Sequence, residues 1–302
     1  MPPIDQTVLV LGATGNQGGA TATRLLSRGW RVRALTRNPS SAAAQSLAAA
    51  GADVIRGDLH DPDVLRAAMR GAYGVFSFQP TWVSAEMTPG VEPDSELRTG
   101  IAVADLAVEL GVQHLVYASS LGADPEHELP SLRTKGRIEE HIRTTGIPAT
   151  CLRPVSFMEN YLGTSRALRV QDGKIKTAIA PHVRELLVAV ADIGAFAELA
   201  FGDPERFAGQ AFEIAGDRLT PPQIAAAVGA ASGSTIEYEQ IPIETLRAVS
   251  PRLARSFETI NAEPYDVDID ALRRLHPELL SFAGWLRGID RNQLAAGYPA
   301  AS

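Results

Sequence analysis

The chain of 302 residues is poor in the residue types that build disulfides and metal sites. Its single cysteine, Cys151, excludes an internal disulfide and a cysteine-ligated metal cluster. That cysteine lies in an apolar stretch, which predicts a buried strand and an unreactive core thiol. The six histidines show no metal-ligand spacing, and the chain has no GxSxG, HExxH or P-loop motif. We therefore expect no metal centre.

Long apolar runs and an excess of basic residues are also lacking. No run approaches the ~20 apolar residues that a membrane-spanning helix needs, and the N-terminal segment does not resemble a signal peptide. Lys and Arg number 28 against 35 Asp and Glu, a net charge of −7. Binding to a nucleic-acid backbone is therefore not expected. We expect a cytoplasmic protein with a small-molecule substrate and no nucleic-acid or membrane partner, and leave a homodimer or a regulatory protein partner open.

Short apolar stretches alternate with helical patterns through the first half of the chain. This rhythm is typical of an α/β fold with a doubly wound parallel sheet. The predicted strands cover residues 8–11, 31–36, 53–56, 74–78, 114–118 and 149–153. The predicted helices between them cover residues 19–28, 42–50, 62–69, 94–110 and 132–145.

A glycine-rich turn joins the first predicted strand to the first helix, with glycines at 12, 15 and 18. Gly12 allows the tight turn, Gly15 lets the backbone approach a ligand, and Gly18 lets the helix pack close to the sheet. The free N–H groups and the positive dipole end of the helix then face an anion. The turn therefore predicts a site for a dinucleotide pyrophosphate. Its expected contacts are Gly12, Thr14, Gly15, Asn16, Gln17 and Gly18.

The end of the second strand bears on which dinucleotide binds. NAD-binding folds place an acidic residue about 20 residues beyond the glycine loop, where it holds the ribose diol. Here the segment reads Thr36-Arg37-Asn38, and the acid is absent. Because Arg37 can pair bidentately with a 2′-phosphate, NADP(H) is favoured over NAD(H). The alternative is a solvated Arg37 in a protein that accepts both cofactors.

Residues after the third and fourth strands are further candidates for contact with the cofactor. Asp58 and Leu59 are expected near the adenine edge, although Asp58 could simply cap a turn. Phe78 and Gln79 are expected to line the adenosine and pyrophosphate, with ordinary packing at the strand end as the alternative.

The pattern is less regular after Pro154. Strands are expected at 174–179, 211–214 and 236–241, a short apolar segment at 186–190, and helices at 193–202, 221–231, 246–260 and 269–272, the first of them capped by Asp192. We expect residues 1–153 to form an NADP-binding domain of the Rossmann type. Residues 154–302 are expected to form a smaller α/β substrate-binding lobe, with residues 183–203 packing back onto the first domain.

Several of these segments together resemble the NmrA-like family, a group of NADP-binding proteins among the atypical short-chain dehydrogenase/reductases. The resemblance fades beyond about residue 245. It implies either a regulator that binds NADP(H) with little or no catalysis, or an NADPH-dependent reductase of quinones or other carbonyl and alkene compounds. The segments that carry it are 10–19, 33–38, 57–59, 114–120, 135–140, 152–160, 192–195 and 212–217.

The resemblance also identifies candidate catalytic residues. Ordinary short-chain reductases use a tyrosine as the acid, with a lysine four residues later. Here Lys135 is present, but Ser131 stands at the tyrosine position. Ser120, with Ser119, lies where the family's substrate serine is expected. Lys135 either holds only the nicotinamide ribose, or acts with water as the proton donor, or leaves that role to another residue. The alternative is a surface lysine on its helix with no role in the site.

Candidates for another proton donor are Tyr161, Tyr117 and His127, although Tyr117 is expected in the core and His127 in solvent. Pro154, Phe157 and Met158 are expected to form an apolar wall beside the nicotinamide, with Met158 and Tyr161 facing the substrate. The long loop 81–93 carries Trp82, which we expect either to line the acceptor site or to anchor the loop.

The leading hypothesis is an oxidoreductase that passes hydride from NADPH to a small conjugated acceptor such as a quinone or a carbonyl compound. Quinones need little acid assistance, so the missing tyrosine matters less for them than for ketones. The first alternative is a non-catalytic NADP(H) sensor that binds a partner according to its redox state. The second is a non-redox isomerase or dehydratase.

Overall fold

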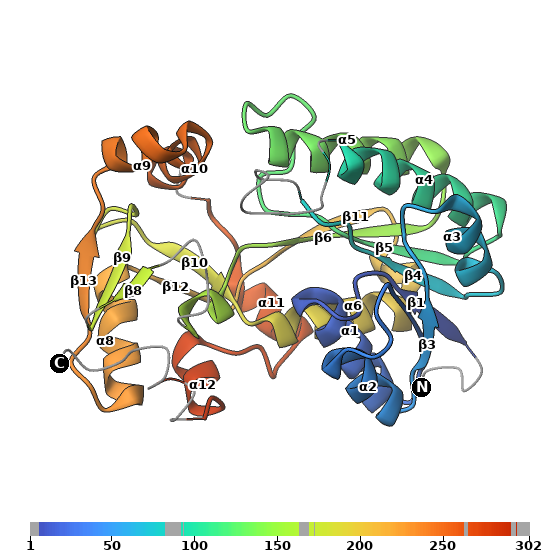
Figure 1. The fold of residues 1–302 in the computed structure, drawn as a ribbon, viewed down its shortest axis with the longest axis horizontal. Helices are drawn as coiled ribbons and strands as arrows, with labels where there is room; N and C mark the ends of the chain where they lie inside the picture. Colours follow the sequence, from blue (N-terminus) through green and yellow to red (C-terminus); the bar gives the residue numbers. More distant parts are fainter. Residues whose placement is uncertain are drawn as a thin grey trace. The chain divides into compact units, whose positions relative to one another are not determined.

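The computed structural model describes residues 6–81, 92, 94–162, 169–171, 173–262, 265–290 and 294. The chain divides into two compact units, and each is described here by itself (Figure 1). The first unit comprises residues 1–154 and 190–213, and the second comprises residues 155–189 and 214–302. The segment that returns to the first unit begins and ends later than the expected 183–203.

The first unit is built on one sheet with the strand order β11-β6-β5-β4-β1-β2-β3. Strands β1 to β6 pair in parallel throughout. The order therefore reverses between β1 and β4, and open α/β sheets bind their ligands at such a switch point. The strands are β1 (Thr7–Val10), β2 (Arg31–Thr36), β3 (Asp53–Arg56), β4 (Gly74–Ser77), β5 (His114–Ala118), β6 (Ala149–Pro154) and β11 (Gln210–Ile214).

Helices cover both faces of this sheet, so the predicted doubly wound α/β fold is confirmed. Helices α1, α2 and α6 lie on one face, and α3, α4 and α5 lie on the other (Figure 1). The helices are α1 (Asn16–Ser27), α2 (Ala42–Ala49), α3 (Pro62–Met69), α4 (Ser95–Glu109), α5 (Pro130–Thr145), α6 (Val190–Gly202) and the short α7 (Pro204–Phe207).

Local sequence explains where several helices begin and how closely they pack. Asp61 caps α3 by accepting hydrogen bonds from the N–H groups of Asp63 and Val64, as its position before Pro62 predicts. Helix α6 begins at Val190, so the expected start at residue 193 with Asp192 as the cap is wrong. A Cβ on Gly194 would lie 2.6 Å from the Ala20 carbonyl oxygen, so this glycine lets α6 cross α1 backbone to backbone.

The second unit contains two small sheets, in the orders β12-β10-β7 and β13-β9-β8. Its core contains apolar side chains from both chain segments of the unit, among them Met158, Ile224 and Phe282. Its strands are β7 (Ser156–Phe157), β8 (Arg169–Gln171), β9 (Lys174–Thr177), β10 (Glu185–Val188), β12 (Asp217–Leu219) and β13 (Glu237–Gln240). Its helices are η1 (Met158–Leu162), α8 (Pro221–Ser232), α9 (Ile243–Val249), α10 (Pro251–Ala262), α11 (Ile269–Leu275) and α12 (Phe282–Arg287).

Two buried groups in the core of the first unit titrate far from their usual range. Cys151 is buried as predicted, and burial raises the pKa of its thiol to about 12. His114 is fully buried, with Nε2 2.9 Å from the Thr150 hydroxyl and Nδ1 without a partner in the described part of the chain. Burial lowers the pKa of His114 to about 4.

Among the described residues, no helix is long and apolar enough to cross a membrane, and no group of His, Cys, Asp and Glu is arranged to hold a metal ion.

The lowered pKa of His114 should make the free energy of unfolding fall in mild acid. The unfolded imidazole takes up a proton below about pH 6.5, whereas the folded one does so only near pH 4. The linkage removes on the order of 2 kcal/mol of unfolding free energy between pH 7 and pH 5. Urea unfolding at the two pH values measures it. His114→Gln should lose this part of the difference, whereas His182→Gln on an exposed loop should keep it. If the change in unfolding free energy between pH 7 and pH 5 were the same in His114→Gln as in the wild type, His114 would not be its source.

Candidate functional site

The glycine turn after β1 is held together by contacts of the backbone itself. Gly12 has a φ of +68°, and the Gly15 N–H donates to its carbonyl at 2.9 Å. A Cβ on Gly12 would lie 2.5 Å from Phe78 Cδ1, and one on Gly18 would lie 2.3 Å from the Gly12 carbonyl oxygen. The first and third glycines are therefore required for packing, whether or not a ligand binds.

Gly15 differs from the other two glycines. Its φ of −96° is accessible to any residue, and the nearest atom to an added Cβ is the Gly12 carbonyl oxygen at 3.4 Å. It is the N-cap of α1, which has no side-chain cap. Thr14, Gly15 and Asn16 are exposed. The turn thus presents bare backbone and the positive end of a 12-residue helix to a ligand, which suits an anion.

A cavity of about 400 Å³ opens beside this turn, at the carboxyl ends of β1, β2 and β4. Its size lies within the range of small-molecule sites. It brings together the glycine turn, the end of β2 and the residues that follow β3 and β4. The lining residues are Gly12, Thr14, Gly15, Leu35, Thr36, Arg37, Asn38, Ser41, Ala43, Gly57, Leu59, Phe78 and Pro80.

Arg37 is exposed at the rim of this cavity, directly after β2. Beside it, the Asn38 side chain accepts the Ser40 N–H at 3.1 Å, and Ser41 caps α2. Among the described residues that line this cavity, none is acidic. Arg37 thus places a positive charge at the end of β2, where the sequence predicts contact with the ribose.

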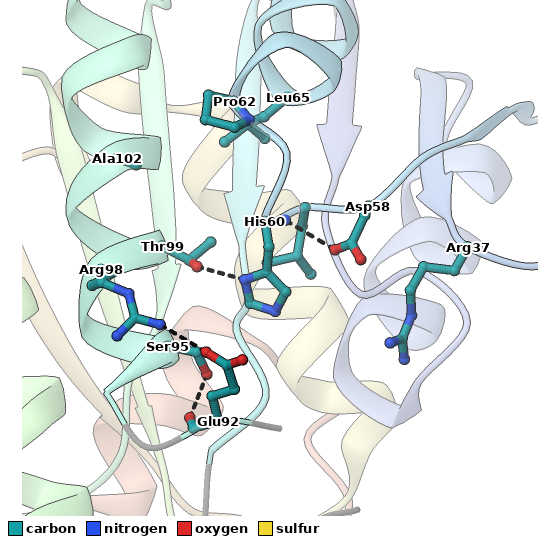
Figure 2. A pocket seen from close by; sticks show the side chains of 11 residues that line it. Arg37, Asp58, His60, Pro62, Leu65, Glu92, Ser95, Arg98, Thr99 and Ala102 are labelled. Atoms are coloured by element: carbon teal, nitrogen blue, oxygen red, sulfur yellow. Dashed lines mark hydrogen bonds and ion pairs between the residues drawn. The ribbon is translucent and has the colours of Figure 1, made fainter. Parts of the chain in front are cut away.

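A second cavity of about 450 Å³ shares Arg37 and Leu59 with the first (Figure 2). Asp58 lines it and accepts the His60 N–H at 3.0 Å, so this carboxylate does cap a turn. The His60 imidazole is held by Thr99, with 2.8 Å between Nδ1 and the hydroxyl oxygen. Sequence reasoning did not single out His60, because a lone histidine after a strand carries no pattern.

Two glutamine side chains near the turn contain buried oxygens without a partner in the described chain, namely the Oε1 atoms of Gln17 and Gln79. Gln79 is almost completely buried, and its Nε2 donates to Ser77 Oγ at 2.8 Å. Since unpaired buried carbonyl oxygens are costly, each is suited to accept a hydrogen bond from a bound molecule or water.

Lys135 does not lie on the surface but forms an ion pair with a residue that the sequence reasoning missed. Its Nζ donates to Glu96 Oε1 at 2.7 Å, with side-chain exposures of 11% and 5%. Thr81 donates to the same oxygen at 3.1 Å. Glu96 lies in the first turn of α4, where an acidic residue is ordinary, so the sequence offered no signal for this pairing.

The two serines after β5 have different surroundings. Ser119 is buried and donates to Glu139 Oε1, which also accepts from Arg153 Nε at 2.9 Å. Its hydroxyl is thus committed to a packed network, whereas Ser120 is partly exposed. Of the two, Ser120 is the one available to a substrate.

None of the three proposed alternative donors is an exposed acid. Burial raises the pKa of Tyr117 well above its usual range, and its hydroxyl has no partner in the described chain. Tyr161 lies in the core of the second unit and donates to Glu185, whose carboxyl has its pKa raised by burial. His127 is partly buried, and its Nδ1 accepts the Leu129 N–H at 2.9 Å.

The residues expected to form the apolar wall fall into different units. Pro154 ends β6 in the first unit, and its carbonyl accepts the Leu121 N–H at 3.1 Å. Phe157 is partly exposed in β7, and Met158 is fully buried in the core of the second unit. Trp82 lies outside the described residues.

A parallel sheet with a strand-order reversal beside a glycine turn defines a protein of the Rossmann-like, nucleotide-binding class. Within that class, the model of the NmrA-like family matches residues 4–284. The chain belongs to the NmrA-like family, and the resemblance seen in its sequence is confirmed.

Relatives of known description include oxidoreductases. The NAD(P)H azoreductase of Xenophilus azovorans is 29% identical over 238 residues, which cover 78% of each chain. The NmrA-like oxidoreductase hkm9 of Aspergillus hancockii is 35% identical over 173 residues, or 54% of this chain. The chain spans only about half the length of hkm9 and of a similar fungal relative.

Solved structures share the fold. NmrA, a negative transcriptional regulator crystallised with NADP, has a TM-score of 0.77 at 19% identity, covering 97% of this chain and 98% of that one. The NADPH-bound quinone oxidoreductase QOR2 of Escherichia coli has a TM-score of 0.72 at 24% identity, covering 94% and 99%.

The packing of the turn makes a prediction about stability. Gly18→Ala should lower the free energy of unfolding by about 2 kcal/mol, because the methyl group meets backbone that cannot move aside. Gly15→Ala is the matched control in the same turn, and should cost less than about 1 kcal/mol. Urea titration measures both, and equal losses would contradict the close approach of Gly18 to Gly12.

Proposed function

We propose that this chain is an NADPH-dependent oxidoreductase that reduces a small conjugated acceptor, such as a quinone, an azo compound or a conjugated carbonyl. The observation that carries the proposal is the open backbone cradle at Gly15, next to the cavity that has Arg37 at its rim. Bound NADPH would supply the hydride. The contribution of the chain is to bind the cofactor, orient it and leave room for the acceptor.

The residues around the cradle fit the parts of a dinucleotide. The backbone N–H groups of Asn16, Gln17 and Gly18, in the first turn of α1, suit the pyrophosphate. Arg37 suits the 2′-phosphate, with Ser41 at the start of α2 close by. Leu59, Asp58 and Phe78 suit the adenosine, and Gln79 Oε1 offers an unused acceptor. Lys135 suits the nicotinamide ribose.

The choice of acceptor follows from what the site lacks. Ser131 replaces the expected tyrosine, and Lys135 is already paired with a buried carboxylate. A ketone needs proton donation from a well-placed acid, whereas a quinone takes hydride and can be protonated by water. The names of the azoreductase relative and of QOR2 support acceptors of this kind.

A second candidate function is an NADP(H) sensor without turnover. The same absence of an acid favours it, and NmrA shares the fold and is described as a regulator. In this role the cradle would bind the cofactor in the same way, and a protein partner would take the place of the acceptor.

Oxidation of NADPH, followed at 340 nm against a panel of quinones, azo dyes and ketones, tests the proposal. We expect turnover with quinones or azo dyes and little with simple ketones. Tight NADPH binding without turnover above background on any acceptor would contradict an enzyme and favour the sensor. An absence of NADPH binding would contradict both functions.

Arg37→Ala should weaken NADPH binding by 10-fold or more and NADH binding less than 3-fold, since only NADPH carries the 2′-phosphate; a bidentate charged contact contributes about 1.5–3 kcal/mol. Fluorescence titration with both cofactors measures the ratio. Arg70→Ala, an exposed arginine at the end of α3, is the control and should leave both affinities unchanged. Equal weakening for both cofactors in Arg37→Ala would contradict the assignment of the 2′-phosphate.

A further inference from the structure

Lys135 lies where four parts of the first unit converge. It projects from α5, and its Nζ reaches Glu96 in the first turn of α4. A longer contact of 3.5 Å joins Nζ to the Ala118 carbonyl at the end of β5. Thr81, which follows β4, donates to the same Glu96 oxygen. The ammonium is therefore fixed at the carboxyl ends of β4 and β5, on the side of the sheet where such folds bind ligands.

The ion pair between Lys135 and Glu96 is buried. Both side chains are almost hidden from solvent, so each charge depends on the other for compensation. Removing one partner of a buried pair costs far more than removing one partner of an exposed pair.

Helix α5 packs closely against α4 and against the loop that follows β5. A Cβ on Gly100 of α4 would lie 2.6 Å from Ile138 Cδ1 of α5. A Cβ on Gly136, next to Lys135, would lie 2.2 Å from the Asp124 carbonyl carbon. These two contacts hold the backbone of α5 around Lys135 close to α4 and to the loop that follows β5.

The other charged and titratable groups around Lys135 are engaged elsewhere. The ring of Tyr117 lies below Nζ, 5.9 Å from its centroid, with a fully buried hydroxyl. Glu139, one turn further along α5, accepts from Ser119 and forms a bidentate pair with Arg153. Among the described residues, Glu96 is the carboxylate that meets Lys135.

We propose that Glu96 is a positioning residue that holds Lys135 as a fixed cation, so that the lysine binds the ribose of the cofactor and does not serve as the proton donor. The proposal rests on the proposed function, because it assigns one binding contact within that site. It selects one of the three roles that the sequence left open for Lys135. The proton that completes reduction of the acceptor then comes from water.

The competing explanation is that the pair only ties α4 to α5. A tie of that kind affects stability but does not couple Glu96 to the contact between Lys135 and the cofactor. A positioning residue acts through Lys135, so its removal should matter for binding only while the lysine is present.

A double-mutant cycle on NADPH affinity separates the two explanations. We expect Glu96→Gln and Lys135→Met each to raise the Kd about 10-fold, and Glu96→Gln/Lys135→Met to raise it no more than about 20-fold. The double variant removes both charges and leaves none unpaired. Glu109 lies on α4, as Glu96 does, and forms an exposed ion pair with Arg66 of α3. Glu109→Gln, which breaks this pair, should not change the Kd. A 100-fold effect in the double variant, or a wild-type Kd in Glu96→Gln, would overturn the proposal.

Should Glu96→Gln fail to fold, Glu96→Asp keeps the charge but retracts it by one methylene. We expect a Kd between those of the wild type and Lys135→Met, against no change in Glu109→Asp. A wild-type Kd in Glu96→Asp would then overturn the proposal.

A second readout does not depend on the cofactor. Acetylation of lysines by an amine-reactive ester, followed by mass spectrometry, reports how well each ammonium is protected. We expect Lys135 to react at least 10-fold faster in the Glu96 variant, and Lys176, paired with Glu239, to react at its usual rate. Unchanged labelling of Lys135 overturns the proposal. The two hypotheses fail separately. If Lys135 is labelled faster in the Glu96 variant but the wild-type protein does not bind NADPH, the proposed function is overturned, while the result still supports the positioning of Lys135 by Glu96.

Discussion

The candidate site depends on one contact, the close approach of Gly18 to the carbonyl of Gly12. A side chain on Gly18 would overlap that carbonyl oxygen, so the start of α1 can reach the end of β1 only because the position is a glycine. This approach points the free N–H groups of α1 at the place where the strand order reverses. Phe78 after β4, Arg37 after β2 and Leu59 after β3 then line the same cavity. The glycine turn therefore sets the free N–H groups of α1 beside the cavity in which we propose that the cofactor binds.

A second constraint is the buried ion pair between Lys135 and Glu96, which fixes a positive charge at the ends of β4 and β5. An ammonium held in this way is suited to donating hydrogen bonds to a bound ligand. Together with Ser131 in the place of tyrosine, this favours chemistry that needs hydride delivery and little acid assistance. The chain would thus retain the cofactor-binding part of its family's fold while narrowing the acceptors that it can reduce.

The alternation of strands and helices in the first unit was predictable from the sequence, because buried parallel strands are short apolar runs bounded by turns. Strands 31–36, 53–56 and 114–118 have the predicted bounds. The start of α6 was misplaced, since Asp192 resembles a cap but lies inside the helix. The partnership of Glu96 with Lys135 joins residues 39 positions apart, through a packing of α4 on α5 that no local pattern encodes. The same holds for His60 with Thr99, and for the burial of Tyr161 in the core of the second unit.

The central claim is that the glycine turn, Arg37 and Lys135 form one binding surface for NADPH. A crystal structure of the protein grown with NADPH tests this most directly. The account predicts the pyrophosphate against the N–H groups of Asn16 to Gly18, the 2′-phosphate on Arg37, and Lys135 bonded to the nicotinamide ribose while still paired with Glu96. A cofactor that lies elsewhere, or a Lys135 that leaves Glu96 to approach the acceptor, would contradict it.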